Sequence, residues 1–182
     1  MYDRYFGLKQ KPFKSNVVAS DVFVGAEAKR LLKCLDSAFS YEDAVFLVTG
    51  PSGVGKSTLT KWALQEHSAK ALLIRLPRAR LSHDEVLDFL LDKLGATAVP
   101  TGMLRKLILC KKLIADLNKV GTPLAVLVED ATRVGEDGLV ELENLTAADA
   151  DEGSGARLVL LGNDNLAVSL RAAALARLRQ RV

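Results

Sequence analysis

The stretch GPSGVGKST, Gly50 to Thr58, combines the residue types and the spacing that hold a chain of phosphates. Glycines let a backbone curl until several N–H groups point inward at phosphate oxygens, and a helix starting there adds its positive end. In the pattern G-x-x-x-x-G-K-[ST], Lys56 can neutralise β- and γ-phosphates and Ser57 can hold Mg²⁺. The predicted binding residues are Gly50, Pro51, Ser52, Gly53, Val54, Gly55, Lys56, Ser57 and Thr58.

A second chemical feature ends the apolar run LAVLV at 124–128, which leads into two adjacent carboxylates, Glu129 and Asp130. Ligands of parallel sheets gather at the carboxyl ends of the strands, so this pair should lie beside the phosphate loop. One carboxylate would anchor Mg²⁺ through water, and the other would polarise an attacking water. We assign the metal to Glu129 with Ser57 and the water to Asp130; two solvated acids at a strand end are the alternative.

A third polar position follows the apolar run RLVLLG at 157–162. Asn163 comes next and is the candidate for contact with the γ-phosphate or the attacking water. Asp164 is expected to cap the following helix, because Asp is a favoured N-cap residue. A simple turn is the alternative, since Asn and Asp are both common in turns.

Elements that could position these residues alternate along the chain. Runs at 44–49, 71–76, 124–128 and 157–162 are apolar at successive positions, as buried parallel strands are. Helical patterns lie between them at 57–68, 82–95, 101–118 and 136–149, and Ser82 with Glu85 forms a capping box. The alternation predicts a three-layer α/β fold around a parallel sheet. We expect one domain, 1–182, with a lead-in and helix at 1–43 and the core at 44–182.

Charge and composition exclude fewer classes of function than the motifs do. The net charge of +3 is too small to indicate nucleic acid by itself, and DNA binding stays open. Residues 129–152 hold nine acids and one base, whereas the last residues of the chain are rich in arginine. The acidic part of one molecule could therefore bind the basic part of a neighbouring molecule. Two solvated faces without a partner explain these charges equally well.

Location and redox state follow from what the sequence lacks. No apolar run approaches the ~20 residues that span a bilayer, and the start has no secretory apolar region, so a cytoplasmic location is expected. The two cysteines, Cys34 and Cys110, have no metal-type spacing. We expect reduced, packed thiols.

Two other classes of phosphate-loop protein share the GPSGVGKST pattern. ABC transporter ATPases need an LSGGQ-type signature before the second acidic strand, and the sequence has none. Guanylate kinases need an Arg- and Tyr-rich nucleoside monophosphate site after the first helix. Only Arg75, Arg78 and Arg80 are available there, and no Tyr follows residue 41, so both classes are disfavoured.

With these motifs in place, the chain resembles the AAA+ ATPases of the ExeA type (general secretion pathway protein A), whose relatives include pilus-biogenesis and transposition helper ATPases. The opening MYDRYFGLKQKPF is similar to the family's Tyr-Phe-Gly-Leu then Pro-Phe start, LVLLGNDNL to its sensor segment, and LARLRQRV to its Leu-Arg-Gln-Arg-Ile stretch. The resemblance covers nearly the whole chain.

The resemblance implies roles for the site residues. Gly50 to Thr58 would be the Walker A loop, Glu129-Asp130 the Walker B pair and Asn163 sensor 1. Arg179 or Arg181 would be an arginine finger that reaches a neighbour's γ-phosphate, which implies a head-to-tail ring or filament. The segment with Tyr5, Phe6, Pro12 and Phe13 would lie near the adenine. ATP and Mg²⁺ are the implied cofactors. The resemblance would place the protein at the inner membrane only through regions that are not in this chain.

The sequence departs from the family in two places. The family's third strand usually ends Asp-Glu-Ala-Gln, whereas this one ends Glu129-Asp130-Ala131-Thr132. The family also continues past the position of Val182 into a strand and a helical lid, which this chain lacks. From the order Glu129-Asp130 we expect intact binding of ATP and Mg²⁺, with hydrolysis that is slow or dependent on a partner.

Three functions stay open from the sequence. The first is an ATPase that drives oligomer assembly or remodels a partner in secretion or pilus biogenesis, with a DNA-associated transposition helper as its variant. The second is a nucleotide-binding switch with very weak hydrolysis. The third is a small-molecule kinase, which transfer of phosphate to an acceptor would reveal.

Overall fold

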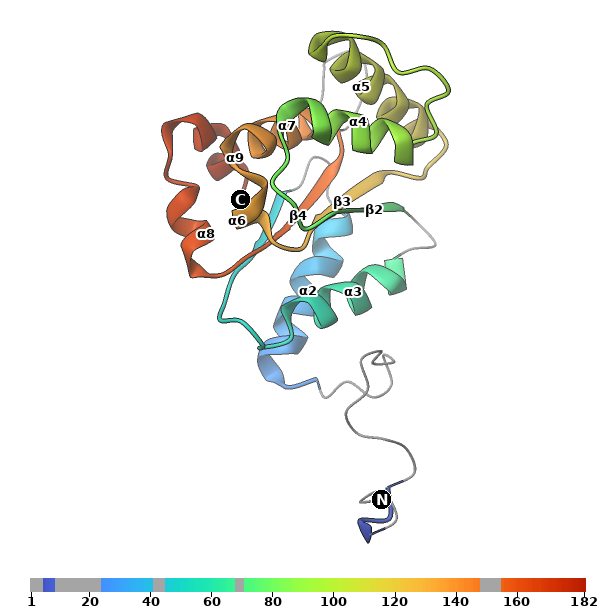
Figure 1. The fold of residues 1–182 in the computed structure, drawn as a ribbon. Helices are drawn as coiled ribbons and strands as arrows, with labels where there is room; N and C mark the ends of the chain where they lie inside the picture. The colour runs from blue at the N-terminus through green and yellow to red at the C-terminus, as the bar shows by residue number, and fades with distance from the viewer. Residues whose placement is uncertain (1–4, 9–23, 41–44, 68–70, 148–154) are drawn as a thin grey trace.

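The computed structural model describes residues 5–8, 24–40, 45–67, 71–147 and 155–182 (Figure 1). Its strands are β1 (Val45–Val48), β2 (Leu72–Leu76), β3 (Leu124–Val128) and β4 (Arg157–Leu161). They form one sheet in the order β1-β4-β3-β2, and every neighbouring pair is parallel. The four strands expected from the apolar runs are therefore all present, each within a residue or so of its predicted bounds.

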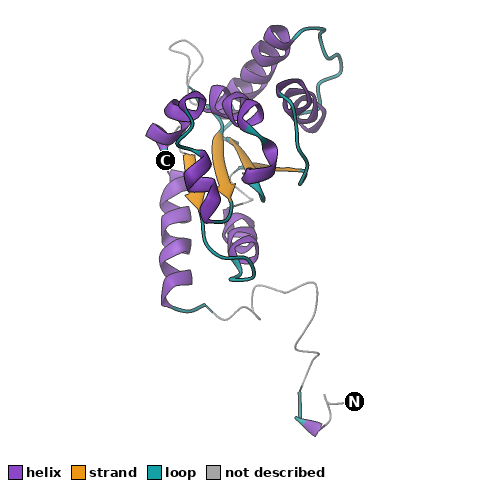
Figure 2. Ribbon diagram, turned by 60° about the vertical axis from the view of Figure 1, so that its left-hand side comes forward, coloured by secondary structure: helices purple, strands orange, loops and turns teal. Residues whose placement is uncertain are grey.

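Helices connect the strands and cover both faces of the sheet (Figure 2). The longer ones are α2 (Ala26–Ser40), α3 (Lys56–His67), α4 (His83–Lys93), α5 (Met103–Lys119) and α7 (Glu136–Thr146). The shorter ones are α6 (Ala131–Val134), α8 (Asp164–Ser169), the 3₁₀ turn η2 (Ala173–Leu175) and α9 (Ala176–Arg181). Of these short segments only α8 was expected, as the helix that follows Asp164. The other three are too brief to show a helical period in the sequence.

Two apolar cores lie on opposite faces of the sheet. The smaller joins Leu35 of α2 and Ala63 of α3 to side chains of β1, β3 and β4. The larger joins the other face to α4, α5, α7 and the C-terminal helices. Figure 1 shows the same division, with α2 and α3 below the sheet and α4, α5 and α7 above it. The predicted three-layer α/β architecture is confirmed.

Strand β3 shows why its sequence has no polar position. Its neighbours on both sides are strands, and all five of its residues are buried. Val126 packs into the larger core and Leu127 into the smaller one, because successive side chains of a strand point to opposite faces. A strand that is covered on both faces and paired on both edges must be apolar throughout.

Helix α4 begins where the sequence predicts. The Ser82 hydroxyl accepts a hydrogen bond from the Glu85 N–H at 3.4 Å, and Glu85 Oε2 accepts one from the Ser82 N–H at 2.8 Å. The bonds that the Ser82 N–H and the Ser82 hydroxyl donate to Glu85 Oε2 lower the pKa of this carboxyl, and the backbone bond is the main cause. The predicted capping box is confirmed.

Some expectations are corrected or fall outside the described residues. Cys110 is buried as predicted, but Cys34 is exposed on α2, so only one thiol is packed. Residues 148 and 149, at the end of the helix expected at 136–149, lie outside the described residues. None of the helices that the structure describes is both long and apolar enough to span a membrane.

The two thiols should differ in reactivity. Burial raises the pKa of the Cys110 thiol to about 12, so the folded protein offers almost no Cys110 thiolate at neutral pH. We expect one equivalent of a maleimide to react with the native protein, at Cys34, and two after denaturation. Peptide mapping by mass spectrometry identifies the site, and rapid native labelling of Cys110 would contradict the burial.

Candidate nucleotide-binding site

The register of the sheet brings the chemical residues to one edge. Val48 of β1 pairs with Leu161 of β4, while Val128 of β3 pairs with Leu160 of β4 and Leu76 of β2. Each of these strands therefore ends at about the same level. The phosphate loop, the acid pair and the polar end of β4 follow at this level, as the parallel arrangement predicts.

The phosphate loop curls as its glycines require. Gly53 has φ of +85° and Gly55 has φ of +90°, a region that side chains other than glycine rarely adopt. Helix α3 then begins at Lys56, so its first N–H groups face the loop. Lys56 Nζ donates hydrogen bonds of 2.7 Å to the carbonyls of Gly50 and Pro51. The Lys56 side chain thus spans the phosphate loop. It is predicted to neutralise the phosphates that this loop binds.

Glu129 is held by two cations. Its Oε1 lies 2.9 Å from Lys61 Nζ of α3, and its Oε2 pairs with the guanidinium of Arg78, which follows β2. Only 11% of the Glu129 side chain is exposed. Burial raises the pKa of this carboxyl, but the hydrogen bonds and charges of Lys61 and Arg78 outweigh it and leave the pKa below its usual value. Glu129 is therefore ionised and paired at neutral pH.

Asp130 has a different environment. It precedes α6 at the N-cap position, yet its side chain accepts no hydrogen bond from the backbone of that helix. Instead, the Thr132 hydroxyl donates a bond of 2.6 Å to Asp130 Oδ1. No ion pair of Asp130 is found within the described residues. The two acids of the pair are consequently held by different groups.

Asn163 caps α8, which corrects the expectation that Asp164 does so. Asn163 Oδ1 accepts a bond of 3.1 Å from the Asn165 N–H. Because the amide oxygen is used in this way, the Nδ2 group is the part of Asn163 that can donate to a phosphate or a water. Gly162 fixes the turn before it, since its N–H donates to the Val48 carbonyl at 3.1 Å.

One cavity of about 390 Å³ unites these groups. Its lining residues come from the phosphate loop, the acid pair, the end of β4 and the segment after β2. They are Ser52, Gly53, Gly55, Lys56, Ser57, Thr58, Arg78, Glu129, Asp130, Gly162 and Asn163. The structure thus brings the predicted phosphate loop, acid pair and Asn163 together.

Three residues of the site were missed from the sequence. Lys61 lies four residues after Ser57, hence one helical turn further along the same face, a spacing that could have indicated it. Arg78 had been considered only as part of a nucleoside monophosphate site. Thr132 replaces the family's usual Gln, and no pattern indicated its contact with Asp130.

The donors in the cavity suit a magnesium nucleotide. Mg²⁺ is usually bound by one or two carboxylates, with phosphate oxygens and water completing its shell. Ser57 and the acid pair offer such ligands, and the curled loop with the start of α3 offers N–H groups to phosphates. Among the described residues no cluster of three or more His, Cys, Asp or Glu is placed to hold a metal alone. The set therefore fits a cation that arrives with phosphates.

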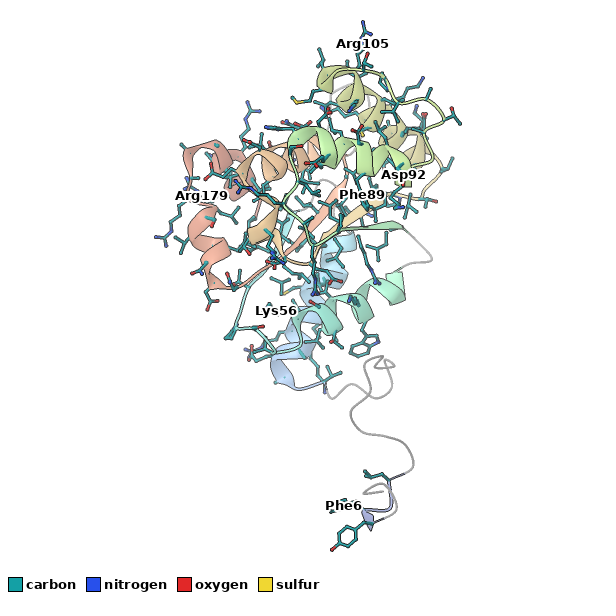
Figure 3. All side chains as sticks on the ribbon, viewed as in Figure 1. Phe6, Lys56, Phe89, Asp92, Arg105 and Arg179 are labelled. Atoms are coloured by element: carbon teal, nitrogen blue, oxygen red, sulfur yellow. The ribbon has the colours of Figure 1, made fainter. Side chains whose placement is uncertain are left out.

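The other predicted site residues lie outside this cavity. Arg181 donates to the Thr146 carbonyl and hydroxyl at 3.0 and 3.1 Å and lies 3.6 Å from Glu143, so it is tied to α7. Arg179 is exposed and projects from the surface (Figure 3). Tyr5 is 85% exposed and its ring contacts Phe6.

These two aromatic rings are not among the residues that line the cavity, and their expected place near the adenine stays a prediction. Pro12 and Phe13, which were expected to lie near the adenine with them, are outside the described residues.

Comparison with known families decides the classification. The family model described as AAA domain matches residues 40–169, which is most of the chain and includes every residue that lines the cavity. The chain belongs to the AAA domain family. This AAA domain is 26% identical to general secretion pathway protein A of Aeromonas hydrophila over 184 residues, all of this chain but 34% of that protein. The chain thus spans about a third of that relative's length, and the resemblance to the ExeA type is confirmed.

Solved structures confirm the fold of this AAA domain. The Cdc6p protein of Pyrobaculum aerophilum matches 94% of this chain and 47% of its own, with a TM-score of 0.68 and 14% identity. The ORC2 protein of Aeropyrum pernix matches the same shares with a TM-score of 0.58 and 20% identity. At sequence identities this low, the similarity to these structures shows a shared fold and nothing more.

A substitution at Gly162 tests how tightly α8 packs against the turn that precedes Asn163. A Cβ at this position would lie 2.5 Å from Leu166 Cδ2 and 2.7 Å from Leu166 Cβ, so α8 must shift. We expect Gly162→Ala to destabilise the fold by about 1–3 kcal/mol, the usual cost of overpacking. Chemical denaturation measures the change, and unchanged stability would show that α8 has room to move.

Proposed function

We propose that this AAA domain binds ATP with Mg²⁺ in the cavity and hydrolyses it, and that its nucleotide state controls self-assembly or a protein partner. The observation that carries the proposal is the convergence of a curled phosphate loop, two carboxylates and a polar side chain on one cavity. In nucleotide hydrolases of this kind the protein mainly positions phosphates and water and stabilises charge. Each group in the cavity suits one of these tasks.

The proposed binding steps use groups with defined partners. Phosphates would receive N–H donors from the loop and Lys56, which would exchange its bonds to Gly50 and Pro51 for bonds to phosphate oxygens. Ser57 and one acid of the pair would hold Mg²⁺, which supplies charge neutralisation at the β- and γ-phosphates when bound. Asp130 is the proposed partner of the attacking water, and Asn163 would donate from Nδ2.

A nucleotide-binding switch with very weak hydrolysis is the second candidate. The ion pairs of Glu129 favour it, because both carboxylate oxygens already have cationic partners. A carboxylate in this state must give up a partner, or act through water, before it contributes to a metal site. Hydrolysis would then wait for an event that rearranges Lys61 or Arg78.

The comparisons support the nucleotide and suggest the biological setting. The ORC2 structure of Aeropyrum pernix is of ADPNP and ADP complexes, which supports adenine nucleotides as the ligands here. The full-length match to part of general secretion pathway protein A supports a role in secretion. We propose a protein partner of such a system.

Loss of Lys56 should strongly weaken nucleotide binding. A charge-assisted hydrogen bond contributes roughly 1.5–3 kcal/mol, so we expect Lys56→Ala to weaken binding of a non-hydrolysable ATP analogue about 100-fold. Isothermal titration calorimetry with Mg²⁺ present measures the affinity. Lys112→Ala, which removes an exposed lysine of α5, is the matched control and should bind normally. Equal affinity of the two variants would contradict the proposed site.

Phosphate release separates the candidate functions. An ATPase gives inorganic phosphate above the Lys56→Ala background, a switch gives tight binding with release near that background, and a kinase gives transfer to an acceptor. The assay should be run at protein concentrations that allow assembly, because a residue supplied by a neighbour would otherwise be missing.

Arg179 and Arg181 should have different effects. Arg181 is bound to α7, so Arg181→Ala should lower the melting temperature, whereas exposed Arg179 has no such contact within the described residues. If Arg179 is the arginine finger, Arg179→Ala should be stable, bind nucleotide normally and lose assembly-dependent hydrolysis.

Mixing tests whether the finger acts between subunits. The Arg179→Ala subunit keeps its phosphate loop, and the Lys56→Ala subunit keeps its arginine, so a mixture should regain hydrolysis if the arginine reaches a neighbour. Mixtures as inactive as the separate variants would contradict a finger supplied in trans.

A further inference from the structure

The carboxylate of Asp130 is restrained on one oxygen. Thr132 Oγ1 lies 2.6 Å from Asp130 Oδ1, which is a short hydroxyl–carboxylate bond. Both side chains are partly buried, so the bond is partly screened from water. Within the described residues no contact is recorded for Asp130 Oδ2. One oxygen of Asp130 is therefore fixed, while the other remains able to accept a hydrogen bond from a molecule in the cavity that it lines.

Local structure explains why this bond forms. An Asp at an N-cap usually accepts a bond from a backbone N–H of the first helical turn. Asp130 does not, although α6 starts directly after it. Thr132 lies in that first turn, and its hydroxyl takes the place of the backbone donor. The Asp130 carboxylate is thereby held by a side chain two residues further along the chain instead of by the backbone of α6.

The restraint matters because of the length of the side chain. Asp is one methylene shorter than Glu, so its carboxylate has fewer rotatable bonds with which to reach a water. A small displacement of a reacting group can cost orders of magnitude in rate. A fixed carboxylate at position 130 compensates for the shorter reach better than a freely rotating one.

We propose that Thr132 is a positioning residue that orients the Asp130 carboxylate toward the water that attacks the γ-phosphate. The inference rests on the proposed function, since it needs hydrolysis at this site. The inference also connects two departures from the family, the order Glu129-Asp130 and the presence of Thr132 two residues after Asp130. In this view Thr132 compensates for the shorter side chain of Asp130. The hydroxyl acts only through Asp130 and contacts neither nucleotide nor metal.

The test compares two substitutions of nearly the same shape. Thr132→Val keeps the branched side chain and removes the hydroxyl, whereas Thr132→Ser keeps the hydroxyl and removes the methyl. We expect kcat for ATP hydrolysis to fall about tenfold in Thr132→Val and to stay within about threefold of wild type in Thr132→Ser, as loss of one orienting hydrogen bond predicts. The affinity for a non-hydrolysable analogue and the KM should not change in either variant.

A double-mutant cycle shows whether Thr132 acts through Asp130. In an Asp130→Asn background, Thr132→Val should have no further effect on kcat, because the group that it orients is already lost. Thermal unfolding of all variants excludes a general loss of structure. Full activity of Thr132→Val, an equal loss in Thr132→Ser, or additive losses in the double variant would each overturn the inference.

Failure of the proposed function looks different. If wild type releases no more phosphate than Lys56→Ala at assembling concentrations, the ATPase proposal and this inference fall together. If wild type is active and only the Thr132 pattern is missing, the ATPase proposal stands and the positioning role is rejected.

Discussion

The ion pairs of Glu129 join the three parts of the molecule on which the site is built. Glu129 follows the central strand β3, Lys61 belongs to the helix that begins at the phosphate loop, and Arg78 follows the edge strand β2. A single, largely buried carboxylate thus connects the end of β3 to helix α3 and to the segment after β2. Because a largely buried charge is costly without partners, loss of Lys61 and Arg78 would leave the Glu129 carboxylate uncompensated. The arrangement of the cavity depends on this carboxylate before any chemistry is considered.

The same interaction sets the charge of the cavity. Lys56 and Arg78 line the cavity together with Glu129 and Asp130, and Lys61 pairs with Glu129, so the charges of the protein groups nearly balance one another. A polyphosphate with its cation brings a further pair of opposite charges into this balance. The site can therefore accept the ligand by exchanging partners rather than by collecting unpaired charges. Such exchange makes the orientation of each acid, and not only its presence, important for the chemistry.

Much of the fold could be predicted from the sequence because its signals are local. Strand β3 is apolar at all five positions since it is covered on both faces, and Ser82 with Glu85 defines the start of α4 through bonds within four residues. The phosphate loop could be predicted for the same reason, since spacing alone carries its chemistry. The resemblance to ExeA-type ATPases rested on short motifs. The match of the AAA domain model to residues 40–169, together with the 26% identity to general secretion pathway protein A, confirms it.

The remaining features depend on contacts between distant segments. Arg78 and Glu129 are 51 residues apart, so no local pattern could pair them. The capping role of Asn163 instead of Asp164 was missed because both residue types favour that position. Only the folded backbone, in which Asn163 accepts a bond from the Asn165 N–H, distinguishes them. Cys34 and Cys110 have similar helical surroundings in the sequence, and only packing distinguishes the exposed thiol from the buried one.

The bonds from Lys56 to the carbonyls of Gly50 and Pro51 have a consequence for ligand selection. They close the phosphate loop on itself, so a ligand enters by competition with the protein's own backbone. A weak anion, such as a single phosphate group, offers Lys56 little more than the carbonyls already do. A longer chain of phosphates offers several charges at once and can displace them. At the proposed site, this competition would favour ligands of high charge density.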